Sequence, residues 1–380
     1  MAMEYPCSAA DIDVAVSGRR QRRLLSVSRY LHPVKGLQPS PDPPTKPEEP
    51  PTPPHHWLSL LDQHYYGQAE VMLRLVTCWD FDIFIFDRMT NGDAVVFMIE
   101  HMFNTYGLIR HFGLDPLRLR QFAVTLQDMY YTRHSYHTSV HAADVIQAMS
   151  CLLQDPKLKP YLTPVDVMAA LLAAATHDLS HPGVNQNYIV KNNHFLSALY
   201  QDGSPLENYH YNLAMGLFKT SGLLEPLSQQ DRTRFGEVVQ ALILATDISR
   251  QSKYLALFST HIQNGDLDVA DEQHRLFMLQ IVMKCSDICN PCRTRLVSLY
   301  WSHLVMREFF RQGDMERGQH QEISPLWDRH STNMANTQSA FISFVVEPLF
   351  SLWNKYSGSA LSSTMLQNLQ ANKQFWTTSK

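Results

Sequence analysis

Apolar residues recur every three to four positions through most of the chain after residue 57. This spacing places the apolar side chains on one face of a helix. It predicts long helical stretches over residues 69–78, 140–153, 165–177, 235–245, 275–285 and 296–310. Turn-forming groups of Gly, Asn, Asp, Ser and Pro separate many of them, and the sequence contains no alternating strand pattern of useful length. We therefore predict an all-α fold, a compact domain of many helices over residues 57–380.

The first 56 residues have a different composition. Five arginines surround Ser26 in residues 1–38, and nine of the 21 prolines lie in residues 39–56. We expect a basic, disordered regulatory tail followed by a proline-rich linker, because proline favours an extended backbone. Two sharper interpretations remain open. Arg23 lies three residues before Ser26, which suits kinases that select basic sequences, and the PxxP patterns suit SH3-type domains.

The overall composition excludes several classes of protein. The 380 residues are 44% hydrophobic and 18% charged, which is typical of a folded globular protein. A net charge of -4 argues against a nucleic-acid groove. The longest strictly apolar run, residues 167–175, is far shorter than the roughly 20 residues of a membrane-spanning helix. Since the N-terminus also lacks the pattern of a secretory signal, we expect a cytoplasmic protein with no membrane span.

Two histidines stand four residues apart where one of the predicted helices begins. They are His137 and His141, and Thr138 or Ser139 is expected at the N-cap between them. The residue after His137 is not glutamate, so this is not the zincin motif. Taken alone, the spacing fits a metal or catalytic role, but it also fits polar histidines that are satisfied at a helix start.

A second motif places His177 and Asp178 at the end of a helix rich in alanine and leucine, with His181 and a Pro-Gly stop directly after them. Burying such a pair without compensation is costly. A cation provides that compensation, and one carboxylate can bridge two cations. The motif therefore favours metal-dependent phosphohydrolase chemistry over a hydrogen-bonded helix end. Asp287 is likewise a carboxylate near the end of an apolar helix, where it needs a cation or a network of hydrogen-bond donors. The cysteines beside it do not form a zinc ribbon, because there is no second Cys pair.

Together these motifs resemble the catalytic domain of the class I cyclic nucleotide phosphodiesterases, metal-dependent hydrolases of the HD superfamily. The resemblance covers about residues 57–376. It rests on motifs in the family's order, at residues 136–144, 177–185, 206–208, 244–247, 287–291 and 338–341. The wording of residues 79–84, 241–251 and 287–293 is most similar to the seventh subfamily, which is selective for cAMP, and residues 23–26 resemble its N-terminal region.

The resemblance implies a binuclear metal centre. The implied zinc ligands are His141, His177, Asp178 and Asp287. Asp178 would also bridge to Mg²⁺ or Mn²⁺, and a water activated by the two cations would attack phosphorus in line. His137 would protonate the departing 3′ oxygen, while Glu207 keeps that histidine oriented and protonated. Residues that would hold metal-bound waters or ligands are His181, Thr246 and Asp247.

The resemblance also implies a pocket for the base of the nucleotide. The side chains that would line it are Tyr136, Asn290, Val305, Gln338 and Phe341. Gln338 would make paired hydrogen bonds to the purine, while Phe341 and Val305 would cover its two faces. A glutamine amide donates at one end and accepts at the other, so its orientation selects adenine or guanine.

Four positions depart from the family's pattern. Thr138 replaces an Asn, Ser180 replaces the second Asp of HDxDHPG, Tyr209 replaces a common His, and Ala340 replaces a frequent Gly. The missing carboxylate at position 180 predicts lower metal affinity or slower turnover, by roughly 10- to 100-fold.

Three functions are compatible with these residues. The leading hypothesis is hydrolysis of 3′,5′-cyclic AMP to 5′-AMP, which terminates cAMP signalling. One alternative is a catalytically weakened phosphodiesterase-like scaffold that binds nucleotide and partners, and its support is Ser180. The other is an HD-type phosphohydrolase for acyclic nucleotides, which the pair Gln338 and Phe341 disfavours.

Overall fold

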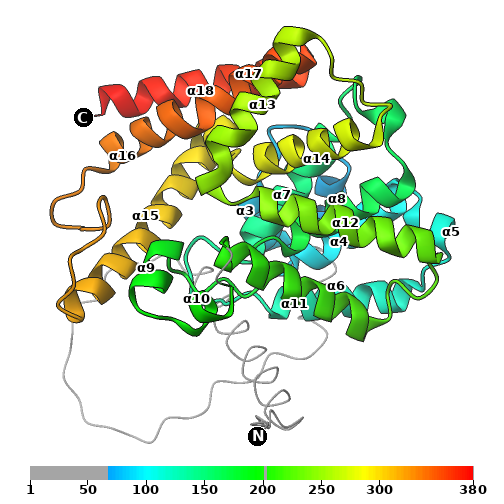
Figure 1. The fold of residues 1–380 in the computed structure, drawn as a ribbon, viewed down its shortest axis with the longest axis horizontal. Helices are drawn as coiled ribbons and strands as arrows, with labels where there is room; N and C mark the ends of the chain where they lie inside the picture. The colour runs from blue at the N-terminus through cyan, green and yellow to red at the C-terminus, as the bar shows by residue number, and fades with distance from the viewer. Residues whose placement is uncertain (1–66, 201–202, 380) are drawn as a thin grey trace, which may run out of the picture. The chain divides into compact units, whose positions relative to one another are not determined.

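The computed structural model describes residues 67–200 and 203–379, and these residues form helices and no strand (Figure 1). This confirms the all-α prediction. The predicted tail and linker, and the predicted start of the helical domain at residue 57, lie outside the described residues. Among the helices described, none combines the length and the apolar character that crossing a membrane requires.

The helices follow one another with short connections. In the first half they are α3 (Ile83–Met89), α4 (Ala94–Thr105), α5 (Leu108–Phe112), α6 (Pro116–Asp128), α7 (Ser139–Leu152), η1 (Lys159–Tyr161), α8 (Pro164–Thr176), α9 (Gln186–Lys191) and α10 (Phe195–Leu199). In the second half they are α11 (Pro205–Ser221), α12 (Gln229–Ala245), η2 (Ile248–Arg250), α13 (Gln251–Asn264), α14 (Glu272–Asp287), η3 (Asn290–Cys292), α15 (Arg295–Gly318), α16 (Met334–Phe341), η4 (Ile342–Val346), α17 (Glu347–Ser357) and α18 (Ala360–Thr378).

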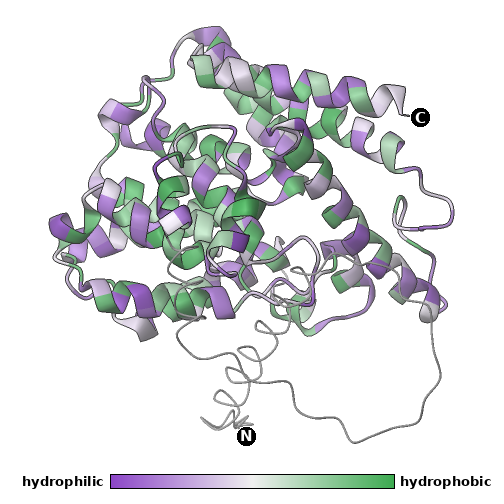
Figure 2. Cartoon of the chain, turned by 180° about the vertical axis from the view of Figure 1, so that it is seen from behind, coloured by the Kyte–Doolittle hydropathy of each residue, from purple (hydrophilic) through white to green (hydrophobic). Residues whose placement is uncertain are grey.

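Helix α8 forms the centre of the core. It begins with a capping box between Thr163 and Asp166, with Pro164 at its first position, and its side chains from Val165 to Thr176 are buried. Small alanine side chains allow close approach, and α7, α12, α14 and α4 pack around it. Figure 2 shows many hydrophobic residues, in green, near the middle of the helical part of the chain. The helix that ends in the His177-Asp178 motif is therefore enclosed on all sides by other helices.

Five of the predicted helical stretches correspond to α7, α8, α12, α14 and α15. Helices α12, α14 and α15 are longer than expected. Helix α12 begins at Gln229 because the Ser228 side chain accepts a hydrogen bond from the backbone N–H of Asp231. Helix α15 continues to Gly318, well past the predicted end at residue 310.

The prediction of a helix over residues 69–78 is wrong in its second half. Helical structure stops at residue 73 and turns follow. The Gln147 side chain from α7 donates hydrogen bonds to the backbone carbonyls of Val76 (2.7 Å) and Cys78 (3.1 Å). Tertiary hydrogen bonds thus satisfy carbonyl groups of this segment in place of helical ones.

Candidate active site

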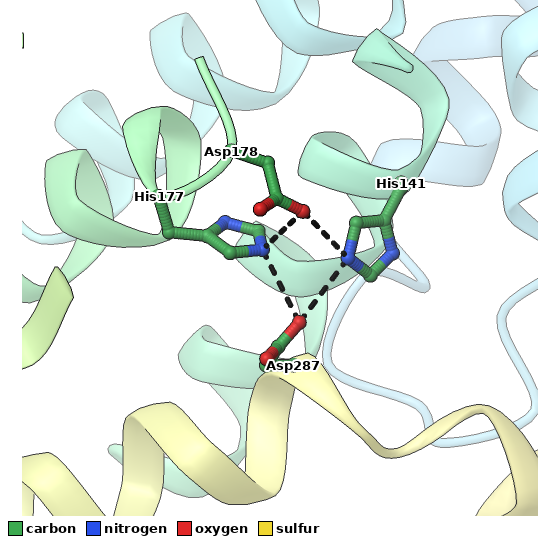
Figure 3. A group of neighbouring side chains, drawn as sticks. All are labelled: His141, His177, Asp178 and Asp287. Carbon is green, nitrogen blue, oxygen red and sulfur yellow. Dashed lines mark hydrogen bonds and ion pairs between the residues drawn. The ribbon is translucent and has the colours of Figure 1, made fainter. Parts of the chain in front are cut away.

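Three helix ends bring two histidines and two carboxylates together (Figure 3). His141 lies in the first turn of α7, His177 is the C-cap of α8 with Asp178 after it, and Asp287 is the last residue of α14. Their ligand atoms all lie within 4.8 Å of one another. The Nε2 atoms of His141 and His177 are each 3.2 Å from Oδ1 of Asp287, and they lie 3.6 and 3.1 Å from Oδ2 of Asp178. The structure thus brings together the four predicted zinc ligands.

The ring orientation of His177 suits a metal ligand. Its Nδ1 donates to the carbonyl oxygen of Ala174 at 2.9 Å. The proton of a neutral ring is then on Nδ1, which leaves Nε2 with a lone pair that faces the two carboxylates. This Nε2 is buried and has no hydrogen-bond partner among the described residues. A cation between Asp178 and Asp287 would satisfy it, so the donor set fits a bound metal.

The cluster has no fixed counter-charge of its own. In the described part of the chain, the ion-pair partners of Asp178 and Asp287 are histidines, and neither carboxylate pairs with lysine or arginine. Burial disfavours a charge on His177, but Asp178 and Asp287 outweigh it and raise the pKa of His177 well above its ordinary value. Burial also opposes charge on Asp178, but the neighbouring histidines lower the pKa of that carboxyl well below its usual range.

His137 lies beside this cluster and bonds to a carboxylate of α15. Its Nδ1 pairs with Oε1 of Glu308, whose side chain is buried, and its Nε2 lies 3.8 Å from Oδ2 of Asp178. The other oxygen of Glu308 accepts from the backbone N–H groups of Tyr136 (3.0 Å) and His137 (3.2 Å). Burial lowers the pKa of His137, but Glu308 and Asp178 outweigh it and raise the pKa to about 9. The ring is therefore protonated at neutral pH.

The carboxylate that orients His137 is Glu308 and not the predicted Glu207. Glu207 lies in the first turn of α11 and is largely buried, and its Oε2 has no hydrogen-bond partner in the part of the chain that the structure describes. Burial and the nearby Asp247 raise the pKa of Glu207 to about 7. The sequence places Glu308 on the same face of the predicted helix as Trp301 and Leu304, but this spacing does not identify His137 as its partner.

Two further histidines surround the carboxylate of Asp178. The ring of His181 stacks on that of His137, with centroids 3.8 Å apart. His210 of α11 donates from Nδ1 to the carbonyl oxygen of Leu179 at 2.8 Å, so its Nε2 is directed elsewhere and lies 3.9 Å from Oδ1 of Asp178. Asp178, His181 and His210 form a second group whose ligand atoms are close enough to hold a cation. His210 was not among the residues predicted from the sequence, although it follows Glu207 by three residues in the same helix.

Thr246 and Asp247 terminate α12. The Thr246 hydroxyl donates to the carbonyl oxygen of Ile243 at 2.8 Å. Asp247 accepts from the Ser204 hydroxyl and from the backbone N–H of Ser249. Both side chains therefore have local partners in the absence of a ligand.

The residues predicted to bind the base occupy η3, α15 and α16. Asn290 is buried and its Oδ1 accepts from the Tyr136 hydroxyl. Gln338 on α16 is buried, and its Oε1 accepts from the Ser302 hydroxyl of α15 at 3.1 Å. Phe341 ends α16 and Val305 lies on α15, and both are half-buried. Helix α15 contacts both Gln338 and the Tyr136–Asn290 pair. Its Ser302 bonds to Gln338, and the neighbouring Trp301 packs edge-on against Tyr136.

The four departures from the family pattern differ in their surroundings. Thr138 occupies the N-cap of α7, but its side chain makes no capping hydrogen bond. Ser180 has a left-handed backbone (φ 56°), and its hydroxyl donates to the carbonyl oxygen of Met129 at 3.0 Å. Tyr209 packs against the buried group around Tyr188, and Ala340 lies within α16.

Comparison with known proteins gives concordant results. Residues 136–369 match the model of the family described as 3'5'-cyclic nucleotide phosphodiesterase. Two curated relatives are the proteins named 3',5'-cyclic-AMP phosphodiesterase 4C of Mus musculus and Rattus norvegicus. They are 32% and 31% identical to this chain over alignments of 285 residues that cover 72% of it.

The chain is shorter than these relatives. The matched region covers 41% of the mouse protein and 53% of the rat protein, so the chain spans about half the length of the curated relatives it matches. Neither relative supports the finer resemblance to the seventh subfamily, which stays a prediction.

Proposed function

The chain belongs to the 3'5'-cyclic nucleotide phosphodiesterase family, and we propose that it hydrolyses 3′,5′-cyclic AMP to 5′-AMP and so terminates cAMP signalling. The observation that carries the proposal is the convergence of His141, His177, Asp178 and Asp287 beside the His137–Glu308 pair. The names of the two relatives support cAMP as the substrate. A cytoplasmic location is part of the proposal.

The donor set supports two divalent cations. His141, His177, Asp178 and Asp287 would hold zinc, because imidazole nitrogens and carboxylate oxygens are among its usual ligands in proteins. The second oxygen of Asp178 faces His210 and is available to a harder cation, Mg²⁺ or Mn²⁺. When bound, the cations neutralise phosphate charge and lower the pKa of a water.

His137 is proposed as the general acid. The Glu308 carboxylate holds Nδ1, so the Nε2 proton is directed toward the cluster, where the phosphate would bind. Hydrolysis forms a bond from phosphorus to the water oxygen and breaks the bond from phosphorus to the 3′ oxygen of ribose. His137 gives its proton to that oxygen as the bond breaks, and the proton that the attacking water loses passes to solvent, from which His137 is protonated again. A pKa of about 9 keeps the acid loaded at neutral pH.

The remaining predicted residues have supporting roles in this proposal. Asn290, with the Tyr136 hydroxyl, and Gln338 present hydrogen-bonding groups to adenine, and Phe341 and Val305 enclose its faces. Residues that hold waters or the phosphate around the cations are His181, Glu207, Thr246 and Asp247.

Ser302 bears on the choice of base. Its hydroxyl is within hydrogen-bond distance of both the Ser298 carbonyl (2.9 Å) and Oε1 of Gln338 (3.1 Å). A hydroxyl has one proton, so it can donate to only one of these oxygens at a time. The Ser302 hydroxyl alone therefore does not fix the orientation of the Gln338 amide. The preference for cAMP over cGMP depends on further contacts.

The test is an assay of purified protein with zinc and magnesium, using cAMP, cGMP and the acyclic nucleotide ATP in turn. We expect turnover of cAMP above that of cGMP and none of ATP. His137→Gln should lower cAMP turnover about 10²- to 10⁴-fold. The matched control is His111→Gln, an exposed histidine on α5, which should keep full activity.

Two results would contradict the proposal. No turnover of a cyclic nucleotide by metal-loaded protein would favour the nucleotide-binding scaffold. Faster turnover of ATP would favour an HD-type phosphohydrolase for acyclic nucleotides.

A further inference from the structure

Three arginines near His137 lack the carboxylate partners that eight other arginines of the described residues have. Arginines paired with carboxylates include Arg118, Arg120, Arg234, Arg250, Arg275, Arg293, Arg317 and Arg329. Arg133, Arg307 and Arg311 are exposed, and none of them pairs with an acidic side chain within residues 67–200 and 203–379. We call these three residues the arginine rim.

A chain of contacts connects the arginine rim with the proposed general acid. The ring of His137 stacks on His181, and two residues further on Gly183 lies against the ring of His134. A Cβ atom at Gly183 would be only 2.3 Å from Nδ1 of His134, so the loop and the ring are in close contact. Nη1 of Arg311 lies 3.2 Å from that Nδ1. The rings of His134 and His181 thus separate Arg311 from His137, at the phosphate end of the site.

The groups around His134 do not cancel the charge of these arginines. A guanidinium only donates, so Nδ1 of His134 accepts from Arg311 and the ring is neutral. Burial lowers the pKa of His134, and Arg311, Arg133 and His137 lower it further against the opposing effect of Glu308. The Glu308 carboxylate is itself paired with His137. The positive charge of Arg133 and Arg311 therefore extends into solvent.

Arg307 adds to this charge. It precedes Arg311 by four residues in α15, so the two side chains share one exposed face of the helix. Two like charges at this spacing destabilise a helix slightly. Both arginines nevertheless lie on this face, in a chain whose net charge is -4. This local concentration of positive charge points to an anionic ligand.

We propose that the arginine rim attracts the phosphate group of the nucleotide to the metal end of the active site. The inference rests on the proposed function, which supplies an anionic substrate and an anionic product. Positive potential beside a site raises the rate of encounter with anions and their occupancy, and salt screens it. The affinity for the uncharged adenosine part of the nucleotide should not depend on these arginines.

The experiment compares binding of 5′-AMP and adenosine to metal-loaded protein by calorimetry at low salt. The variant Arg133→Gln with Arg311→Gln should bind 5′-AMP about fivefold more weakly, from about two- to threefold for each exposed charge. Adding Arg307→Gln should weaken binding by about a further twofold. Adenosine affinity should not change, and at 0.5 M salt the difference for 5′-AMP should largely disappear.

The matched control is Arg110→Gln with Arg232→Gln, which removes the same charge from exposed arginines on α5 and near the start of α12. In Figure 1, α5 lies on the opposite side of the molecule from α15. Equal 5′-AMP affinities for the two double variants would overturn the inference. So would a parallel loss of adenosine affinity, because that indicates damage to the pocket. Absence of cAMP hydrolysis by the unmodified protein would contradict the proposed function alone, since the comparison of 5′-AMP with adenosine needs no turnover.

Discussion

Two groups of buried carboxylates in this protein have different partners. Asp166, at the start of α8, is fully buried and bonds to two arginines. Arg234 donates to its Oδ1 at 3.0 and 3.1 Å, and Arg275 donates to its Oδ2 at 3.1 Å. At the other end of the same helix, Asp178 faces Asp287 across a set of histidines and no arginine. The same helix therefore carries a carboxylate with permanent cations at one end and one without them at the other.

The two sites differ in whether the side chains paired with the carboxylate can lose a proton. Arginine stays charged at all accessible pH values, so the Asp166 site is complete and can only be structural. Histidine can lose its proton and present a lone pair to a metal. The His177 ring is oriented for this by its hydrogen bond to Ala174. A buried carboxylate cluster whose partners are histidines is thus suited to receive a cation, whereas one paired with arginines is not.

The largest expected effect on activity comes from removing the charge of Asp287 in the histidine-rich cluster. Asp287→Asn should reduce cAMP hydrolysis by more than about 100-fold, because loss of a ligand should exceed the 10- to 100-fold cost of losing an outer partner. The metal-free protein should remain folded. Steady-state rates and thermal unfolding of the chelated protein measure the two effects.

Asp166→Asn is the counterpart. It leaves Arg234 and Arg275 without a full counter-charge, so it should lower the free energy of unfolding by about 3–5 kcal/mol. Zinc affinity of the folded fraction should not change. If Asp287→Asn unfolds the protein while Asp166→Asn removes zinc, the comparison is wrong.

A smaller effect is expected from the residue that sets the charge of His137. Glu308→Gln removes the main stabilising charge, so the pKa of His137 should fall from about 9 toward its ordinary 6.5. The alkaline limb of the pH–rate profile should move in the same direction, with activity reduced about 10- to 100-fold at pH 8.

The same pair predicts how stability depends on pH. Because the folded pKa of His137 is raised, its contribution is complete below pH 6.5 and is lost as pH rises toward 9. NMR titration of the metal-free protein measures both the pKa and its loss in Glu308→Gln. An unshifted His137 pKa in that variant would show that Glu308 does not set the charge of the acid.

The smallest effect is expected at Ser180. Asp tolerates the left-handed backbone better than Ser, and its carboxylate adds negative charge two residues from Asp178. It cannot donate to the Met129 carbonyl as the Ser180 hydroxyl does. Ser180→Asp should therefore raise zinc affinity only about tenfold, the lower end of the range for outer partners. Equal affinities in competition with a chelator would show that position 180 does not tune the metals.

The four clustered residues were named through the family resemblance, and the motifs that carry this resemblance lie at helix ends. His177 and Asp178 end an apolar helix, and Asp287 ends another. Glu308 was missed because it reaches His137 from a helix more than 170 positions later. No local spacing reports such a contact. The predicted partner, Glu207, is instead a buried carboxyl with a raised pKa near Asp247.

The fold was predictable for a related reason. Helices α7, α8 and α14 bury apolar faces, and their periodicity appears in the sequence. The segment over residues 74–78 shows the limit of that signal. Its apolar spacing is helical, but hydrogen bonds from Gln147 to its carbonyls keep it in turns. The side chain that decides this lies about 70 residues away in the sequence.

The most direct test of the metal centre is calorimetric titration of zinc into chelator-treated protein, alongside Asp287→Asn and Asp166→Asn. The account predicts one tight zinc site in the unmodified protein and in Asp166→Asn, and loss of that site in Asp287→Asn. Tight zinc binding that survives Asp287→Asn would contradict the assignment of the cluster as the metal centre.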